Sequence, residues 1–131
     1  MLIRLSFNSK KIEEMFDVTE ILKEEVKKSG IQNGVAHLYT PHTTCSVVVT
    51  EKTDAAFKYD FITVLKKILS DYQFKHMGGN GEAHLKSALM GVQQSFIISE
   101  GQVILGQWQG VYFIDFDGPR KREVLLKIQA G

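Results

Sequence analysis

The spacing of hydrophobic residues predicts strands at both ends of the chain. Residues 1–7 alternate, so Ile3, Leu5 and Phe7 share one face, which is typical of a half-buried strand. Residues 11–16 show a weaker form of the same pattern. Enrichment in β-branched and aromatic residues predicts further strands at 34–40, 45–50, 95–99, 102–106, 110–116 and 122–128.

Helical spacing appears after the first two strands and again in the middle of the chain. Residues 17–30 are predicted to form a helix, with Asp17 and Glu20 at capping-box spacing. The strongest helical pattern covers residues 54–70, where Asp54 is a suitable N-cap. The apolar stripe of this second helix comprises Phe57, Phe61, Val64, Leu65 and Ile68.

A third, shorter helix is predicted at residues 81–90, with Asn80 as its N-cap. Strands that dominate both ends and helices that cluster between them indicate an α+β fold with two to three helices and mostly antiparallel packed sheets. The apolar runs 102–106 and 111–116 are predicted to be buried on both faces, either within the core or between the core and an oligomer interface. We expect one compact domain over residues 1–131.

Composition narrows the classes of function. The chain has 131 residues, is 44% hydrophobic and carries a formal net charge of +1, so it can bury a core but has no basic excess. Because its lysines and arginines are scattered, we expect no nucleic-acid binding, and the absence of a long apolar run predicts no membrane span. The single cysteine, Cys45, and the lack of a signal-peptide pattern favour a cytoplasmic location.

His42 is the first candidate for a binding or catalytic side chain. It follows Pro41 at the junction of two predicted strands, and Thr43 and Thr44 come directly after it. Such a loop can deliver an imidazole and small hydroxyl donors to a polar pocket. It can equally be a turn whose hydroxyl groups satisfy backbone atoms, and the residues alone leave both interpretations open. For His37, inside a strand, a partly exposed structural role is favoured.

His76 and His84 flank a glycine-rich segment, which raises the possibility of an anion site. Glycines such as Gly79 let the backbone approach a ligand closely, and free N–H groups follow Asn80 at the helix start. The segment lacks the Walker and dinucleotide-binding patterns, so as a bare motif it is weak. A flexible loop followed by a solvent-facing helix histidine is the alternative.

Three histidines can bind a divalent metal, since three imidazoles and a water suffice for zinc. His42, His76 and His84 are the candidate ligands, although no spacing in the sequence requires a metal. A nucleophilic role for Cys45 is less favoured than a buried, inert thiol, because the residue opens an apolar strand.

The candidate acid–base residues are Glu51, which follows a buried strand, and Asp115, which ends another. Asp115 could orient a histidine, and Arg120 could bind a phosphate group. The alternatives are a helix-dipole role for Glu51 and a turn with an ion pair at the end of the strand for the other two. Trp108, the only tryptophan, is expected to pack in the core or an interface rather than to stack on a ligand.

Several motifs together resemble one known family. The segments "HTTCSVVVTEKTD", "GGNGEAHLKSALMG" and "GQVILGQWQGVYFIDFDGPRKR" occur in the order and spacing of the YjbQ-like family, often labelled secondary thiamine-phosphate synthases. The resemblance covers nearly the whole chain. It implies an α+β fold that assembles as a homotrimer, with a polar pocket near a subunit interface, and it also implies a divalent metal, zinc first, on His42, His76 and His84.

The resemblance further implies a small phosphorylated ligand and a weak thiamine-phosphate synthase-type transferase activity. The matching ligand-binding positions are Thr43, Thr44, Gly79, Asn80 and Arg120, and the matching catalytic positions are Glu51, Asp115 and Arg120. This chain departs from the family at Gly78, where many members carry an acidic residue, and at Thr50, where many carry asparagine. A metal-dependent enzyme, a non-catalytic metal- or anion-binding trimer and a trimeric scaffold with structural histidines therefore stay open.

Overall fold

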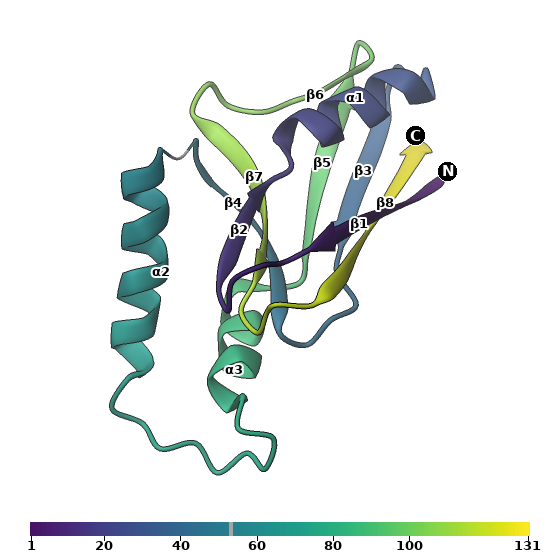
Figure 1. Ribbon diagram of the computed structural model, residues 1–131. Coiled ribbons are helices and arrows are strands. Elements are labelled where there is room, and N and C mark those ends of the chain that lie inside the picture. Colours follow the sequence, from purple (N-terminus) through teal and green to yellow (C-terminus); the bar gives the residue numbers. More distant parts are fainter. Residues whose placement is uncertain (53) are drawn as a thin grey trace.

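Two antiparallel sheets and three helices make up the protein in a computed structural model that describes residues 1–52 and 54–131 (Figure 1). The larger sheet has the strand order β1-β8-β3-β5-β6 and the smaller one the order β2-β7-β4. The predicted α+β fold is thereby confirmed. The strands are β1 (Leu2–Asn8), β2 (Glu14–Asp17), β3 (Gly34–Tyr39), β4 (Cys45–Glu51), β5 (Gln93–Ser99), β6 (Gln102–Val103), β7 (Gln109–Asp115) and β8 (Lys121–Ala130).

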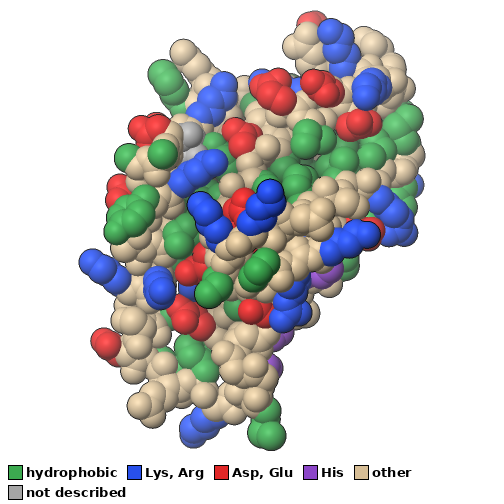
Figure 2. Space-filling model, in the orientation of Figure 1, with side chains coloured by type: hydrophobic (Ala, Val, Ile, Leu, Met, Phe, Trp, Pro, Cys, Tyr) green, Lys and Arg blue, Asp and Glu red, His purple; other side chains and the backbone are tan. Residues whose placement is uncertain are grey.

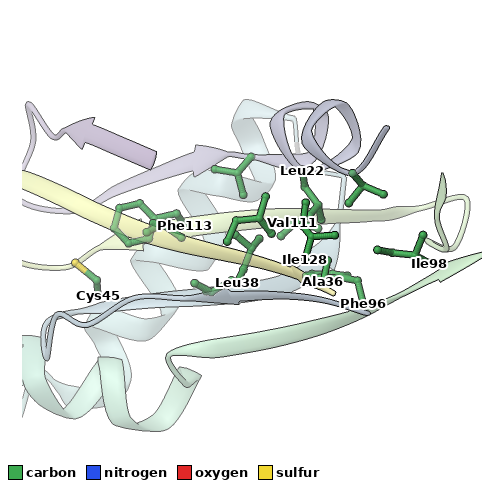
Figure 3. Packing of buried hydrophobic residues seen from close by; sticks show 14 residues of the cluster. Leu22, Ala36, Leu38, Cys45, Phe96, Ile98, Val111, Phe113 and Ile128 are labelled. Carbon is green, nitrogen blue, oxygen red and sulfur yellow. The ribbon is translucent and has the colours of Figure 1, made fainter. Parts of the chain in front are cut away.

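The main core lies between the two sheets and beneath helix α1 (Thr19–Ser29). Side chains such as Leu22 of α1, Leu38 of β3 and Phe113 of β7 meet there, as Figure 3 shows. Each is less than 2% exposed, so the hydrophobic contribution of each to folding is close to its maximum. This core fixes the inner face of β4 and β7, and therefore the loops at the ends of these two strands.

The ends of the helices agree only in part with the capping predictions. Asp54 is the N-cap of α2 (Ala55–Leu69), and its carboxylate accepts a hydrogen bond from the N–H of Phe57 at 2.8 Å, as predicted. The predicted capping box of α1 is wrong. The N-cap is Val18, one residue after Asp17, and the helix begins at Thr19. The Asp17 carboxylate accepts a hydrogen bond from the N–H of Thr19 at 3.0 Å.

The prediction for residues 102–106 is wrong in length and burial. Only Gln102–Val103 pairs as a strand, and Ile104 is 57% exposed. The hairpin begins at a tight turn in which Glu100 and Gly101 have positive φ angles of 53° and 76°, and beyond Val103 the N–H of Ile104 still donates to the carbonyl of Ile97 at 2.9 Å. The prediction for 111–116 is confirmed, since every residue of that run is buried.

Helix α2 is far less buried than its apolar stripe suggests. None of its residues is buried, and Val64 and Ile68 are 53% and 68% exposed. Its other side rests on the outer face of the smaller sheet, where Phe61 and Leu65 pack against a cluster that includes Val48. The helix therefore flanks the fold at its side (Figure 1) and leaves apolar surface uncovered.

Among the described residues, no helix has the length and apolarity needed to cross a membrane. The cytoplasmic location and the homotrimer stay predictions. Helix α3 (Gly81–Met90) completes the fold, and it lies against β4 at the end of the strand that carries Cys45. Its place next to the loop between β3 and β4 is what forms the candidate site.

Candidate functional site

A groove between α3 and the loop joining β3 to β4 brings two of the predicted histidines together. His42 and Thr43 line it from the loop, and His84 lines it from the helix, around a volume of about 420 Å³. In Figure 2, histidine side chains are seen only at the lower right edge of the molecule. We call this cavity the histidine groove.

Two serine hydrogen bonds hold the helix against the strand and so fix the shape of the histidine groove. The Ser87 hydroxyl donates to the carbonyl of Cys45 at 2.5 Å, and the Ser46 hydroxyl donates to the carbonyl of Ser87 at 3.2 Å. All three residues are buried. Because buried hydroxyl groups are costly to leave unpaired, these reciprocal bonds set the position of His84 relative to the loop.

His42 is a neutral imidazole with a defined tautomer. Its Nε2 atom accepts a hydrogen bond from the backbone N–H of Glu123 at 3.0 Å, so the ring proton belongs on Nδ1. Burial lowers the pKa of His42 below its ordinary value of 6.5, and the charge of Arg122 lowers it further, against smaller opposing effects of Asp115 and Glu123. The side chain therefore enters the groove uncharged at neutral pH.

His76 and His84 form a ring pair at the start of α3. Their ring centroids are 4.8 Å apart, and the rings are tilted by 49°. The Nδ1 atom of His76 accepts a hydrogen bond from the N–H of Gly78 at 3.2 Å, which closes a small turn. A Cβ atom at Gly78 would approach Cε1 of His76 to 2.8 Å, so the acidic residue of many family members would displace this ring.

The three histidines do not form a metal-binding cluster as the side chains stand. No group of three or more His, Cys, Asp or Glu residues able to hold a metal occurs in the part of the chain that the structure describes. A histidine that binds a metal usually donates its other ring N–H, whereas His42 and His76 each use a ring nitrogen to accept from the backbone. The residues of one chain therefore do not fit the predicted three-histidine site.

Asp115 is buried, and both of its carboxylate oxygens accept hydrogen bonds from residues other than histidine. Arg122 binds its two carboxylate oxygens at 2.8 and 2.9 Å, and the Ser9 hydroxyl donates to it at 2.6 Å. Burial raises the pKa of Asp115, but the hydrogen bonds from Arg122 and Ser9 outweigh it and leave that pKa below its ordinary value of 3.8. This carboxylate orients Arg122, not an imidazole.

Arg122 links the buried Asp115 to the loop that lines the histidine groove. Its guanidinium donates to the Thr44 hydroxyl at 2.7 Å, and both residues are buried. We call Ser9, Thr44, Asp115 and Arg122 the Asp115 cluster. The predicted ligand-binding Thr44 thus lies inside this cluster, whereas Thr43 is exposed and lines the groove.

Arg120 and Asn80 meet through a shared carboxylate. Asp117 accepts from the Asn80 side chain at 2.8 Å and from the Arg120 guanidinium at 3.0 Å. Asn80 is the N-cap of α3, as predicted, but its side chain makes no capping hydrogen bond. Its amide nitrogen donates across to Asp117, and its buried Oδ1 has no hydrogen-bond partner among the described residues. Gly79 precedes it with a φ of 77°, a conformation that favours glycine.

Glu51 lies far from these residues within one chain. It ends β4 opposite Gln109, whereas Cys45 at the other end of the strand pairs with Asp115. Six residue steps along a strand span roughly 20 Å. The three predicted catalytic residues are therefore not brought together: Glu51 is remote, Asp115 is buried, and Arg120 is exposed at the turn before β8.

The sequence reasoning missed Arg122 and Ser9, which organise the buried end of the site. A signal for Arg122 was present, because it occupies a core-facing position of an alternating strand, where a charge requires a partner. Ser9 carried no comparable signal, since it follows a strand in an ordinary polar turn. The prediction of an inert Cys45 fits its environment, because burial raises the pKa of the thiol to about 12.

The fold and the histidine groove define a class: an α+β protein with two antiparallel sheets and a cavity between a helix and a strand-connecting loop, lined by two histidines among mostly apolar surface. The chain belongs to the YjbQ-like family UPF0047, whose model, described as "UPF0047 protein YjbQ-like", matches residues 3–131. The resemblance inferred from the motifs is thereby confirmed.

Similar proteins span almost the whole chain. A UPF0047 protein of Methanocaldococcus jannaschii is 39% identical over 98% of this chain and 94% of its own length, and the UPF0047 protein YugU of Bacillus subtilis is 37% identical over 98% of each. An uncharacterised YjbQ/UPF0047-family protein of Clostridium acetobutylicum has a similar crystal structure, with a TM-score of 0.92, 38% identity, and coverage of 97% and 99%. The family and the fold follow from these likenesses, whereas the function depends on the site.

Proposed function

We propose that this protein binds a small phosphorylated ligand in the histidine groove. The observation that supports this most strongly is that His42 and His84, from separate elements, line one cavity together with the exposed hydroxyl of Thr43. A neutral imidazole with its proton on Nδ1 and a threonine hydroxyl are both hydrogen-bond donors. A volume of about 420 Å³ falls in the range of small-molecule sites.

An exposed arginine lies near the groove. Burial is the main cause of the lowered pKa of His42, and among the charged neighbours Arg122 and Arg120 lower this pKa whereas Asp115 and Glu123 raise it. Arg120 is exposed and holds only one oxygen of Asp117, so its remaining donors are available to a phosphate group. These observations favour a binding role for Arg120 over an acid–base role.

The same geometry favours ligand binding over catalysis as the primary activity. Asp115 accepts hydrogen bonds from Arg122 and Ser9 and from no histidine among the described residues, and Glu51 lies at the far end of β4. A weak thiamine-phosphate synthase-type transferase activity, suggested by family resemblance, remains a secondary proposal. It requires a general base from a partner subunit or from His84 itself.

A homotrimer is proposed as the assembly in which this pocket works. The uncovered apolar side chains of α2, among them Val64 and Ile68, support association, because monomers seldom leave such a surface exposed. A partner copy could also bring Glu51 toward the histidine groove of its neighbour. Sedimentation equilibrium tests this proposal by measuring the molecular mass in solution. We expect the mass of three chains, and a monomer at micromolar concentration would contradict the proposal.

A divalent metal, zinc first, is proposed only as a secondary occupant of the His76–His84 pair. Binding would require His76 to exchange its hydrogen bond from Gly78 for a metal ligand. Elemental analysis after incubation with zinc tests this. Stoichiometric zinc that is lost in folded His76→Ala and His84→Ala variants would support it, and no retained zinc would exclude it.

The ligand proposal is tested by titrating the protein with inorganic phosphate and with thiamine phosphate, following backbone amide resonances. We expect shifts at residues around the histidine groove, and a loss of affinity of about tenfold or more in His84→Ala. His37→Ala is the matched control, because His37 lies on β3 and bonds to Ser95 outside the groove. Equal affinities of both variants, or no saturable shifts in the parent protein, would contradict the proposal.

A further inference from the structure

A second cavity lies between α1 and the segment that follows β5, and its lining is basic. Lys23 and Lys27 face it from α1, and Lys52 faces it from the end of β4. The remaining lining comes from residues 101–109, and the volume is about 470 Å³. We call this cavity the lysine groove. It contains no carboxylate side chain among its lining residues.

The positive charges of the three lysines in the lysine groove are only weakly balanced by nearby carboxylates. Lys23 lies 3.7 Å from Glu20 in an exposed pair, which is a weak interaction. For Lys27 and Lys52, no carboxylate of the described residues comes within 4 Å of the ammonium nitrogen. In a chain with a net charge of only +1, two lysines without a carboxylate partner and a third in an exposed pair form a local positive centre around one cavity.

The walls of the lysine groove are held by backbone hydrogen bonds, so the cavity is formed before any ligand arrives. The N–H of Lys52 donates to the carbonyl of Trp108 at 2.7 Å, which ties the end of β4 to the 106–109 turn. Within that turn, the Gln109 side chain accepts from the N–H of Gly106 at 2.8 Å. On the other side, Gly101 donates to the carbonyl of Gln32 at 3.0 Å.

The spacing of the lysines indicates an extended anion rather than a single small one. Lys23 and Lys27 are one helical turn apart, so their Cβ atoms are separated by roughly 5–6 Å. Lys52 approaches from a different element, and Gln102 and Gln107 add amide groups to the lining. A chain of two or three phosphates can contact several of these donors at once.

We propose that the lysine groove is a binding site for a small oligophosphate, separate from the histidine groove. The two cavities lie at opposite ends of β4, since Lys52 follows Glu51 whereas Cys45 adjoins the loop that carries His42. The phosphate chain could be free or part of a nucleotide, because both present the same negative charges. This proposal does not depend on the ligand of the histidine groove.

Isothermal titration with inorganic tripolyphosphate tests the lysine groove directly. We expect saturable binding by the full chain that weakens as salt is added, because exposed charges are screened. The variant Lys27→Gln/Lys52→Gln should bind roughly tenfold more weakly or worse, since it loses two charge-assisted contacts. A parallel titration with adenosine triphosphate distinguishes the sources: equal affinity supports a free oligophosphate, and tighter binding supports a nucleotide.

The matched control is Lys28→Gln/Lys67→Gln, which removes the same charge from exposed lysines outside the lining. We expect this control to bind tripolyphosphate like the parent protein, and in His84→Ala the binding that Lys27→Gln/Lys52→Gln weakens should remain. No saturable binding by the parent, or an equal loss in the control and groove variants, would overturn the proposal. A loss confined to His84→Ala would also overturn it, because the anion would then occupy the histidine groove.

Discussion

The Asp115 cluster and the histidine groove meet in the loop before β4, where Thr44 belongs to the cluster and Thr43 to the groove, yet their polar side chains are used in different ways. In the Asp115 cluster, Asp115 and Arg122 are buried and each hydrogen-bonds to several partners. In the histidine groove, His84 and Thr43 face a cavity. The difference teaches that a dense set of polar residues marks a ligand site only where donors or acceptors remain unused.

The largest expected effect is the loss of Arg122. Replacing Arg122 with methionine removes both hydrogen bonds to a carboxylate that is fully buried, and leaves its charge uncompensated. We expect a loss of roughly 3–5 kcal/mol in the free energy of unfolding, measured by urea denaturation. The control is Arg4→Met, because the Arg4–Glu123 pair is exposed and should contribute less than about 1 kcal/mol. Equal losses in the two variants would show that the Asp115 cluster is not structural.

Thr44→Val sharpens the same comparison at a single hydroxyl group. The change keeps the side-chain volume but leaves a buried nitrogen of Arg122 without one of its acceptors. We expect a loss of about 1–3 kcal/mol in stability. Thr43→Val is the neighbouring control, because Thr43 is exposed, and its effect on stability should stay within about 0.5 kcal/mol. If Thr43→Val is the more destabilising change, the assignment of the two hydroxyl groups is reversed.

A pH titration of stability tests the neutral state of His42. Since the pKa of His42 in the folded protein lies below 6.5, the unfolded chain binds more protons in the window just below pH 6.5. Stability should therefore be fully present above pH 6.5 and should fall as the pH drops through that value toward the folded pKa. Comparing the unfolding free energy at pH 7.5 and 5.5 measures the change.

The control for this titration is His42→Gln, which keeps an acceptor for the N–H of Glu123 but does not titrate. Its stability should change less between the two pH values than that of the parent protein. An identical pH dependence in both proteins would mean that His42 is not the titrating group. The loss of stability that follows protonation of Asp115 does not interfere, because this loss begins only near and below pH 3.8.

The smallest expected effect on stability belongs to His84→Ala. This side chain is only partly buried and makes a ring contact with His76. We expect the midpoint of thermal unfolding to move little, with a free-energy change within about 0.5 kcal/mol, while the affinity for phosphate falls about tenfold or more. A large destabilisation would place His84 with the structural residues of the Asp115 cluster, and would remove the main support for the histidine groove as a ligand site.

Local patterns were sufficient for most elements of the fold. Alternation in residues 1–7 and the uninterrupted apolar run 111–116 each corresponded to a strand with the expected burial. Asp54 was identified as a cap because the preference for an acidic N-cap depends only on nearby backbone N–H groups. The prediction failed at Asp17 because a tertiary contact shifts the start of the helix: the N–H of Val18 donates to the carbonyl of Val111 in β7 at 2.9 Å. Nothing in the structure explains why the strand ends before residues 104–106.

The candidate site was predictable as a set of residues but not as an arrangement. The sequence singled out His42 and His84, and both do line one groove. It could not show that Asp115 faces Arg122 rather than an imidazole, because the partner of a buried carboxylate depends on strand register across the sheet. Nor could it show that Lys52 faces the same cavity as two lysines of α1.

By itself, then, the sequence determined the α+β class, the order of the elements, the family and the residues worth testing, since these depend on periodicity, local chain preferences and motif order. Only the tertiary structure decided which polar groups are already satisfied. Arg122 became structural and the lysine groove emerged because distant segments meet when the sheets and α1 bury their apolar faces. Side chains far apart in sequence acquire a common environment only when the core forms.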